Sequence, residues 1–209
     1  MNARLIVRLY RVIFGLLALA AIGTQLLSLV GKPQFNPVSY FSYFTIDSNL
    51  IAAVLLLVCA APSRANHPLR LDVLRGAAVV YMAVTGIVFT LLLSGTDVDT
   101  AIPWVNTVVH ELMPLVLLAD WLLGAPVERL SVHHGLLWLS FPLAWIVYTL
   151  IRGSISGLYP YPFLNPVNGG YASVAAYSFA VLVLMALVCA AVLWLGNTRN
   201  AARTVGQPI

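Results

Sequence analysis

The chain has 209 residues, of which 61% are hydrophobic and only 9% are charged, and its mean hydropathy is +0.93. This composition excludes an ordinary soluble domain and indicates an integral membrane protein. In a membrane protein an excess of basic residues, here a net charge of +4, relates to orientation in the bilayer. We therefore expect no nucleic-acid partner. Six apolar stretches of membrane-spanning length leave no room for a soluble domain, so we expect one all-α bundle over residues 1–209.

The first three predicted membrane helices cover residues 6–30, 40–61 and 76–94. An aromatic-rich turn precedes the second helix, which is typical of a membrane–water interface. Between the second and third helices we expect a basic loop that includes Arg70 and Arg75.

The last three predicted membrane helices cover residues 103–124, 135–151 and 171–195. Pro103 suits the first turn of a helix. Residues 153–170 form the longest connection, and loops of that length are usually functional or mobile. We expect a poorly ordered polar tail after the sixth helix.

Basic side chains predict how the helices are oriented. Nine arginines fall on the side of the two termini, whereas Lys32 and Arg152 fall on the other side. The positive-inside rule therefore places both termini in the cytoplasm. We expect the protein in the cell (inner) membrane. The starts of the second and fourth helices and the loop at 153–170 then share the outer face.

The fourth helix carries polar and ionisable side chains at membrane depth. At about 1.5 Å per residue, His110 lies on the order of 10 Å below the outer end. An ionisable residue there is costly and is a functional-site hypothesis by default. Asn106 precedes His110 by four residues and can hold one of its ring nitrogens. Glu111 points about 100° away from His110 and is expected to pair with Arg152 or with another helix.

The second helix contains the densest polar cluster of any span, at about the depth of His110. Its members are Thr45, Asp47, Ser48 and Asn49. A threonine hydroxyl is unreactive until a neighbouring base takes its proton, so Thr45 beside His110 would be an activated nucleophile. Asn49 shares a helix face with Thr45 and could donate a hydrogen bond to the oxyanion.

Three short motifs resemble the androgen-induced gene 1 family. They are Tyr43-Phe-Thr45, then Asn106 and His110 followed by Pro114 and an acid ten residues after the histidine, and Tyr161-Pro-Phe-Leu164. That family, with the androgen-dependent TFPI-regulating protein, consists of six-helix membrane hydrolases, and its bacterial Pr6Pr branch looks closer still. The resemblance implies a threonine hydrolase that cleaves fatty-acid esters of hydroxy fatty acids, with Thr45 as nucleophile and His110 as base.

Structural roles remain open for the same residues. Thr45 can cap a helix or bond to a backbone carbonyl, and His110 can bond to a neighbouring helix. The polar residues at 47–49 can join helices across the bundle. Tyr161 can fix an interfacial loop or cover a cavity above His110. A non-catalytic transporter or binder of a lipid or small molecule, its cavity lined by these residues, is therefore the second hypothesis.

No metal or cofactor is expected, because no helical pair of His or Glu has ligand spacing. Cys59 and Cys189 lie near the cytoplasmic ends of their helices, where thiols stay reduced. Asp120 is also expected near that end, with its carboxylate in reach of water, and His133 and His134 are expected in a solvated turn. The expected partners are a lipid or small apolar ester and the membrane, and the sequence defines no oligomeric state.

Overall fold

The computed structural model describes residues 3–61, 68–95 and 102–205. All regular structure in these residues is helical, so the all-α prediction is confirmed. Five segments are long and apolar enough to cross a membrane, which is the architecture of a multi-pass membrane protein. They are Arg4–Leu29, Leu69–Leu93, Pro103–Leu123, Val132–Ser156 and Gly170–Ala201.

The second of the six predicted spans is shorter than expected. The chain leaves α1 (Ala3–Leu29), forms the short helix α2 (Pro37–Tyr40), breaks, and then forms α3 (Phe44–Ala60). With 17 residues, α3 is shorter than the five candidate spans. Helix α3 packs between α1 and α4 (Leu69–Val88), which bury part of its surface. The break also makes Thr45 the second residue of α3.

The prediction that Arg70 and Arg75 lie in a loop is wrong, because α4 begins at Leu69. Arg75 is buried in α4 and donates to Asp72 in its own helix at 2.9 Å. It also donates to Asp120 at 2.9 Å, and Asp120 accepts from Arg11 at 2.6 Å. Asp120 is therefore enclosed by two guanidinium groups, which corrects the expectation that its carboxylate reaches water.

The fourth predicted span agrees with the structure to within one residue. It consists of α5 (Pro103–Thr107), the π-helical segment η2 (Val108–Leu112) and α6 (Met113–Leu123). Pro103 begins α5, as predicted. Another π segment, η1 (Phe89–Leu93), continues α4. Single π turns inside α-helices are frequent at functional sites.

The fifth span begins earlier and ends later than predicted. It consists of α7 (Val132–Trp138) and α8 (Ser140–Ser156). His133 and His134 belong to the first turn of α7, and His134 caps it by accepting from the Ser131 N–H at 3.1 Å. The helix ends where Gly157 adopts a left-handed conformation, with φ of +72°.

The tail that we expected to be poorly ordered is helical as far as Val205, because α9 runs from Gly170 to Val205. Residues 206–209 lie outside the described part of the chain. Polar residues of α9 bond to the segment between α6 and α7. The side chain of Asn197 pairs with both backbone groups of Leu130, and Asn200 donates to the carbonyl of Pro126. These contacts explain why the helix continues beyond the apolar stretch.

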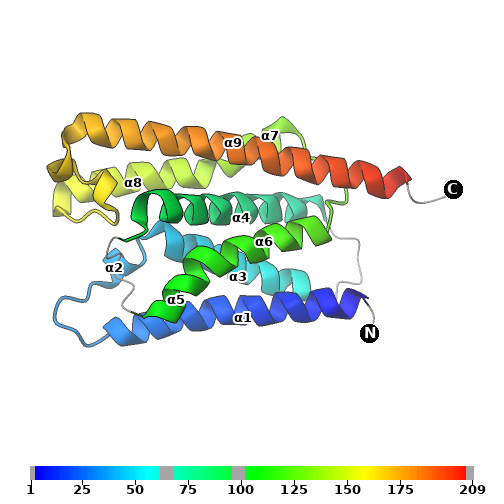
Figure 1. Ribbon diagram of the computed structural model, residues 1–209, viewed down its shortest axis with the longest axis horizontal. Coiled ribbons are helices and arrows are strands. Elements are labelled where there is room, and N and C mark those ends of the chain that lie inside the picture. Colours follow the sequence, from blue (N-terminus) through cyan, green and yellow to red (C-terminus); the bar gives the residue numbers. More distant parts are fainter. Residues whose placement is uncertain (1–2, 62–67, 96–101, 206–209) are drawn as a thin grey trace.

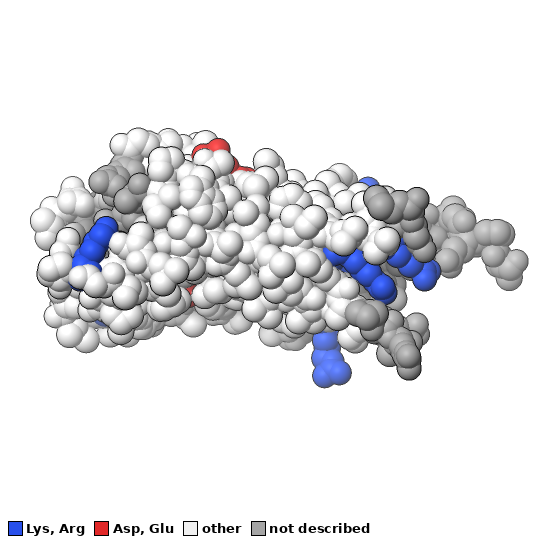
Figure 2. Space-filling view, turned by 90° about the horizontal axis from the view of Figure 1, so that it is seen from below, with Lys and Arg blue, Asp and Glu red and all other residues white. Residues whose placement is uncertain are grey.

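The helices lie side by side with α4 near the centre, in contact with α3, α6 and α9 (Figure 1). Both termini lie at one end of the bundle, and the loop after α8, which contains η3 (Pro162–Leu164) and η4 (Pro166–Asn168), lies at the other end. On the face in Figure 2, basic side chains gather toward the end with the termini. The start of α3 faces the loop end, and that end holds the candidate site.

Candidate active site

Thr45 and His110 meet inside the bundle. The Thr45 hydroxyl oxygen lies 3.3 Å from Nε2 of His110, and the two residues are 6% and 5% exposed. They come from the first turn of α3 and from η2, which are 65 positions apart in the sequence. The predicted juxtaposition of hydroxyl and imidazole is therefore present in the structure.

One backbone carbonyl decides where the protons of this pair lie. Nδ1 of His110 lies 3.3 Å from the carbonyl oxygen of Asn106, which can only accept a hydrogen bond. With neutral imidazole, Nδ1 therefore carries the proton and Nε2 offers its lone pair. It follows that the Thr45 hydroxyl donates to His110, which is the direction that base activation of a nucleophile requires.

Asn106 thus holds His110 as predicted, but it does so with its main chain. The four-residue spacing was informative, since it placed the carbonyl of Asn106 under the ring of His110. The assignment of this contact to the Asn106 side chain is corrected.

The imidazole of His110 is contacted on its ring face as well as at its two nitrogens. Phe89 in η1 stacks on the His110 ring with centroids 4.2 Å apart and planes at 15°. Gly86 allows the close approach of α4, because a Cβ there would lie 3.3 Å from the carbonyl oxygen of His110 and 3.0 Å from Cγ of Pro114. No spacing in the sequence predicted the contact of Phe89 with His110, because Phe89 lies on a different helix.

Asn49 has a structural role in place of the predicted oxyanion donation. Its Nδ2 donates to the Thr45 carbonyl at 2.9 Å and to the Val109 carbonyl at 3.0 Å, which occupies both amide protons. In η2 the N–H of Met113 donates to the carbonyl of Val108. Pro114 has no N–H that could donate to the carbonyl of Val109. Asn49 therefore supplies the donor that the helix lacks, and it ties α3 to η2.

Of the two polar neighbours of Asn49, one joins helices and the other makes no side-chain hydrogen bond within the described residues. Ser48 donates to the carbonyl of Phe44, and it accepts from Thr85 of α4 at 3.4 Å. The side chain of Asp47 is half-buried and makes no hydrogen bond or ion pair within the described part of the chain. Neither side chain is hydrogen-bonded to His110 in the described part of the chain, so both lie beside the pair and not in it.

The structure separates Glu111 and Arg152 from the pair. Glu111 is exposed, whereas the sequence predicted that it pairs with Arg152 or with another helix. The suggested partner of Glu111 is engaged elsewhere, since Arg152 donates to Ser39 at 2.7 Å and to the Leu158 carbonyl at 3.4 Å. Arg152 thereby joins the end of α8 to α2.

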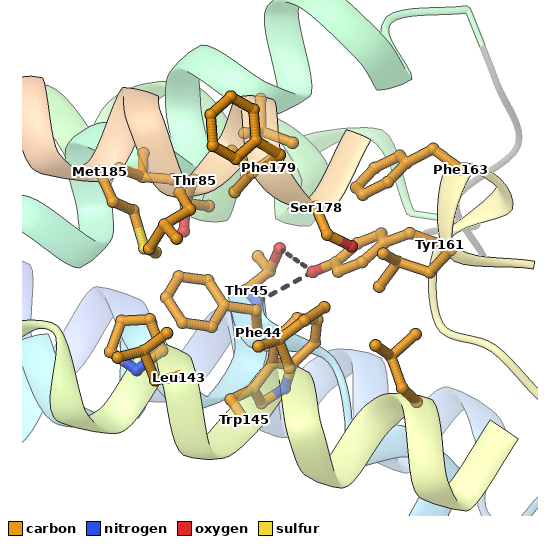
Figure 3. A pocket seen from close by; sticks show the side chains of 18 of the residues that line it. Phe44, Thr45, Thr85, Leu143, Trp145, Tyr161, Phe163, Ser178, Phe179 and Met185 are labelled. Carbon is orange, nitrogen blue, oxygen red and sulfur yellow. Dashed lines mark hydrogen bonds between the residues drawn. The ribbon is translucent and has the colours of Figure 1, made fainter. Parts of the chain in front are cut away.

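Tyr161 reaches from the loop after α8 to Thr45. Its hydroxyl oxygen lies 3.2 Å from the Thr45 hydroxyl and accepts from the Thr45 N–H at 3.3 Å. Its ring stacks on Phe163 and lies edge-on to Tyr43. Figure 3 shows the two hydroxyl groups side by side at the wall of a pocket. The resemblance pointed to this residue, but no spacing predicted its bond to Thr45.

The pocket beside Thr45 is an apolar cavity of about 280 Å³. Its walls come from α3, α4, α8, α9 and the loop, and Leu143 of α8 and Phe179 of α9 lie on opposite sides of it (Figure 3). Both of these residues are also exposed on the outside of the bundle, at 44% and 68%. Thr45 and Tyr161 line the cavity, whereas His110 contacts Thr45 but does not line the cavity. A molecule in the cavity would therefore meet the hydroxyl first.

The described residues contain no cluster of three His, Cys, Asp or Glu side chains that could hold a metal ion. Cys59 and Cys189 are both free thiols. Comparisons with protein-family models, with curated proteins and with solved structures found no match to this chain.

Proposed function

We propose that the protein is an intramembrane hydrolase of lipid esters, with Thr45 as nucleophile and His110 as base. The observation that carries this proposal is the position of one hydroxyl, which donates to an imidazole on one side and faces an apolar cavity on the other. A polar group at the wall of an apolar cavity suits an ester that sits within a long apolar molecule.

The reaction has two stages. Thr45 attacks the ester carbonyl while Nε2 of His110 accepts its proton, and the resulting imidazolium then protonates the departing alkoxide. Water uses the same imidazole to hydrolyse the acyl-threonine. The carbonyl of Asn106 holds the Nδ1 proton throughout, as an orienting acceptor does in a nucleophile–base–acceptor triad.

The substrate reaches the cavity from the bilayer in this account. The cavity is bounded by α8 and α9, and residues of both helices face it and the surrounding lipid. With both termini in the cytoplasm, as the basic residues favour, the site lies in the outer half of the cell (inner) membrane. The resemblance to the androgen-induced gene 1 family favours fatty-acid esters of hydroxy fatty acids as the substrate class.

A second candidate is a non-catalytic binder of a lipid. One observation favours it: the hydroxyl of Ser178, which lines the cavity, is buried without a hydrogen-bond partner within the described residues. Such a group can bind a polar atom of a ligand. In that case the cavity would retain a lipid and Thr45 would be one more polar contact.

The test is ester turnover by purified protein in lipid nanodiscs. Thr45→Val keeps the shape of the side chain and removes the hydroxyl, and His110→Phe removes the base. We expect each change to lower kcat by at least about 10³-fold, because both residues act in one step. Thr149→Val is the matched control, since Thr149 is a buried threonine whose hydroxyl has no partner among the described residues and does not line the cavity.

The control variant is expected to keep the wild-type rate. Lipid that co-purifies with the wild type but is never hydrolysed would favour the binding role. Turnover that persists in Thr45→Val would rule out Thr45 as the nucleophile.

A further inference from the structure

The hydroxyl of Tyr161 has a defined hydrogen-bond direction. The proton of Thr45 is committed to His110, so between Thr45 and Tyr161 the phenolic O–H is the donor. The oxygen of Tyr161 in turn accepts from the backbone N–H of Thr45. The result is a chain of donors that runs from the Thr45 N–H through Tyr161 to the nucleophilic oxygen.

The position of this hydroxyl matches the place where negative charge forms. It lies 3.2 Å from the attacking oxygen, on the side of Thr45 that faces the cavity, and His110 is on the other side. In a tetrahedral intermediate the oxyanion sits one carbon away from the attacking oxygen. A small turn of the O–H bond therefore redirects it from Thr45 to that oxyanion.

We propose that Tyr161 is a catalytic residue that stabilises the oxyanion of the tetrahedral intermediate. The assignment rests on the proposed ester hydrolysis. As the bond between the Thr45 oxygen and the carbonyl carbon forms, the proton of Thr45 moves to His110 and the π electrons of the carbonyl move to its oxygen. Tyr161 then donates its hydrogen bond to that oxygen and keeps its own proton.

The surroundings of Tyr161 suit a neutral donor. Tyr161 is 6% exposed, and burial raises the pKa of its phenol to about 12. The phenol therefore keeps its proton at neutral pH. The Thr45 N–H polarises the phenolic O–H, and hydrogen bonds in such chains strengthen one another. The side-chain amide of Asn49 is not available for this role, because both of its protons bind backbone carbonyls.

The test compares wild type with Tyr161→Phe, which keeps the stacked ring and removes the hydroxyl. We expect kcat to fall by about 10²- to 10³-fold with little change in KM. A long-chain trifluoromethyl ketone, which forms a tetrahedral adduct with a hydroxyl nucleophile, should bind the variant more weakly by a similar factor. The ether analogue of the same length, which forms no oxyanion, should bind both proteins equally.

Tyr159→Phe is the matched control, because Tyr159 belongs to the same loop but packs on Gly153 and does not line the cavity. Equal kcat in wild type and Tyr161→Phe would overturn the role of Tyr161 and leave Thr45 in place. Equal losses for the ketone and the ether would also overturn it, because they indicate a packing role only. A wild type that hydrolyses no ester would remove the proposed function and this assignment together.

Discussion

At the residue scale, a single acceptor sets the chemistry of the site. The Asn106 carbonyl selects the tautomer of His110, the tautomer selects the direction of the Thr45 hydrogen bond, and that direction makes Thr45 a candidate nucleophile. None of the three groups needs a charge in the resting state. This neutrality suits a site in a bilayer, where an isolated charge is expensive.

Asn49 is the residue whose loss should disturb this geometry most directly. In Asn49→Leu the carbonyls of Thr45 and Val109 lose their side-chain donor, so we expect a loss of about 1–3 kcal/mol in stability. We also expect kcat to fall by more than about 10-fold, because α3 and η2 are no longer tied together beside His110.

The control for this variant is Asn197→Leu, which removes a similar amide-to-backbone pairing near the C-terminal end of α9. Its stability should fall, whereas kcat per folded molecule should not change. Denaturant titration in detergent gives the first quantity and ester turnover gives the second. A normal kcat in Asn49→Leu would mean that Asn49 does not position the pair.

The sequence predicted Thr45 and His110 as a pair because depth along two helices can be counted from a common membrane surface. It did not predict Phe89 or the bond of Tyr161, since both depend on how separate elements pack. It also gave Asn49 the wrong role. Whether an amide is free depends on which backbone carbonyls lack donors, and the π segment that creates this need has no clear sequence pattern.

At the element scale, Pro114 shapes the helix that carries His110. Because proline has no N–H, Pro114 cannot make the regular α-helical hydrogen bond. The chain adopts the π segment η2 just before α6. The extra residue in that turn sets the rotation of His110 toward Thr45.

Pro114→Ala tests this idea. The new N–H allows η2 to relax toward a regular α-helix, so we expect stability to be unchanged or higher. We expect kcat to fall by about 10- to 100-fold, because a misplaced base loses its alignment. Pro103→Ala is the control, since Pro103 is an exposed residue in the first turn of α5, and it should alter neither quantity. A fall in stability with normal turnover would contradict this role of Pro114.

Two of the helix boundaries missed in the prediction are explained by contacts with residues far apart in the sequence. Hydropathy located all the apolar segments, but it started the third span too late, since it counts the buried Arg75 as a loop residue. It also ended the last span too early, since Asn197 and Asn200 find partners in the segment before α7. The prediction treats these polar residues as solvated, whereas in the fold they are hydrogen-bonded to other parts of the chain.

At the scale of the whole molecule, a buried ionic cluster joins three helices away from the site. Arg11 of α1, Arg75 and Asp72 of α4, and Asp120 of α6 form it, and Arg75 also donates to the carbonyl of Gly124. Every charge in the cluster has a partner of opposite charge. The cluster thus fixes how α1, α4 and α6 are positioned relative to one another.

Asp120→Asn should reveal what the cluster contributes. It leaves Arg75 and Arg11 buried with less compensation, and removal of one partner from a buried ion pair typically costs about 3–5 kcal/mol. We expect a corresponding drop in stability in detergent, with normal kcat in the molecules that stay folded. Glu128→Gln is the control, since Glu128 is exposed. Loss of kcat without loss of stability would place Asp120 in the reaction and contradict this account.

The proposed reaction requires the Thr45 hydroxyl to become covalently bound to the acyl group. Peptide mass mapping after treatment with a long-chain fluorophosphonate shows whether Thr45 forms such a bond. The probe reacts with an activated hydroxyl and leaves a stable adduct. We predict one adduct, on the peptide that contains Thr45, with none in Thr45→Val and strongly reduced labelling in His110→Phe. An adduct on another residue, or labelling that persists in Thr45→Val, would contradict the account.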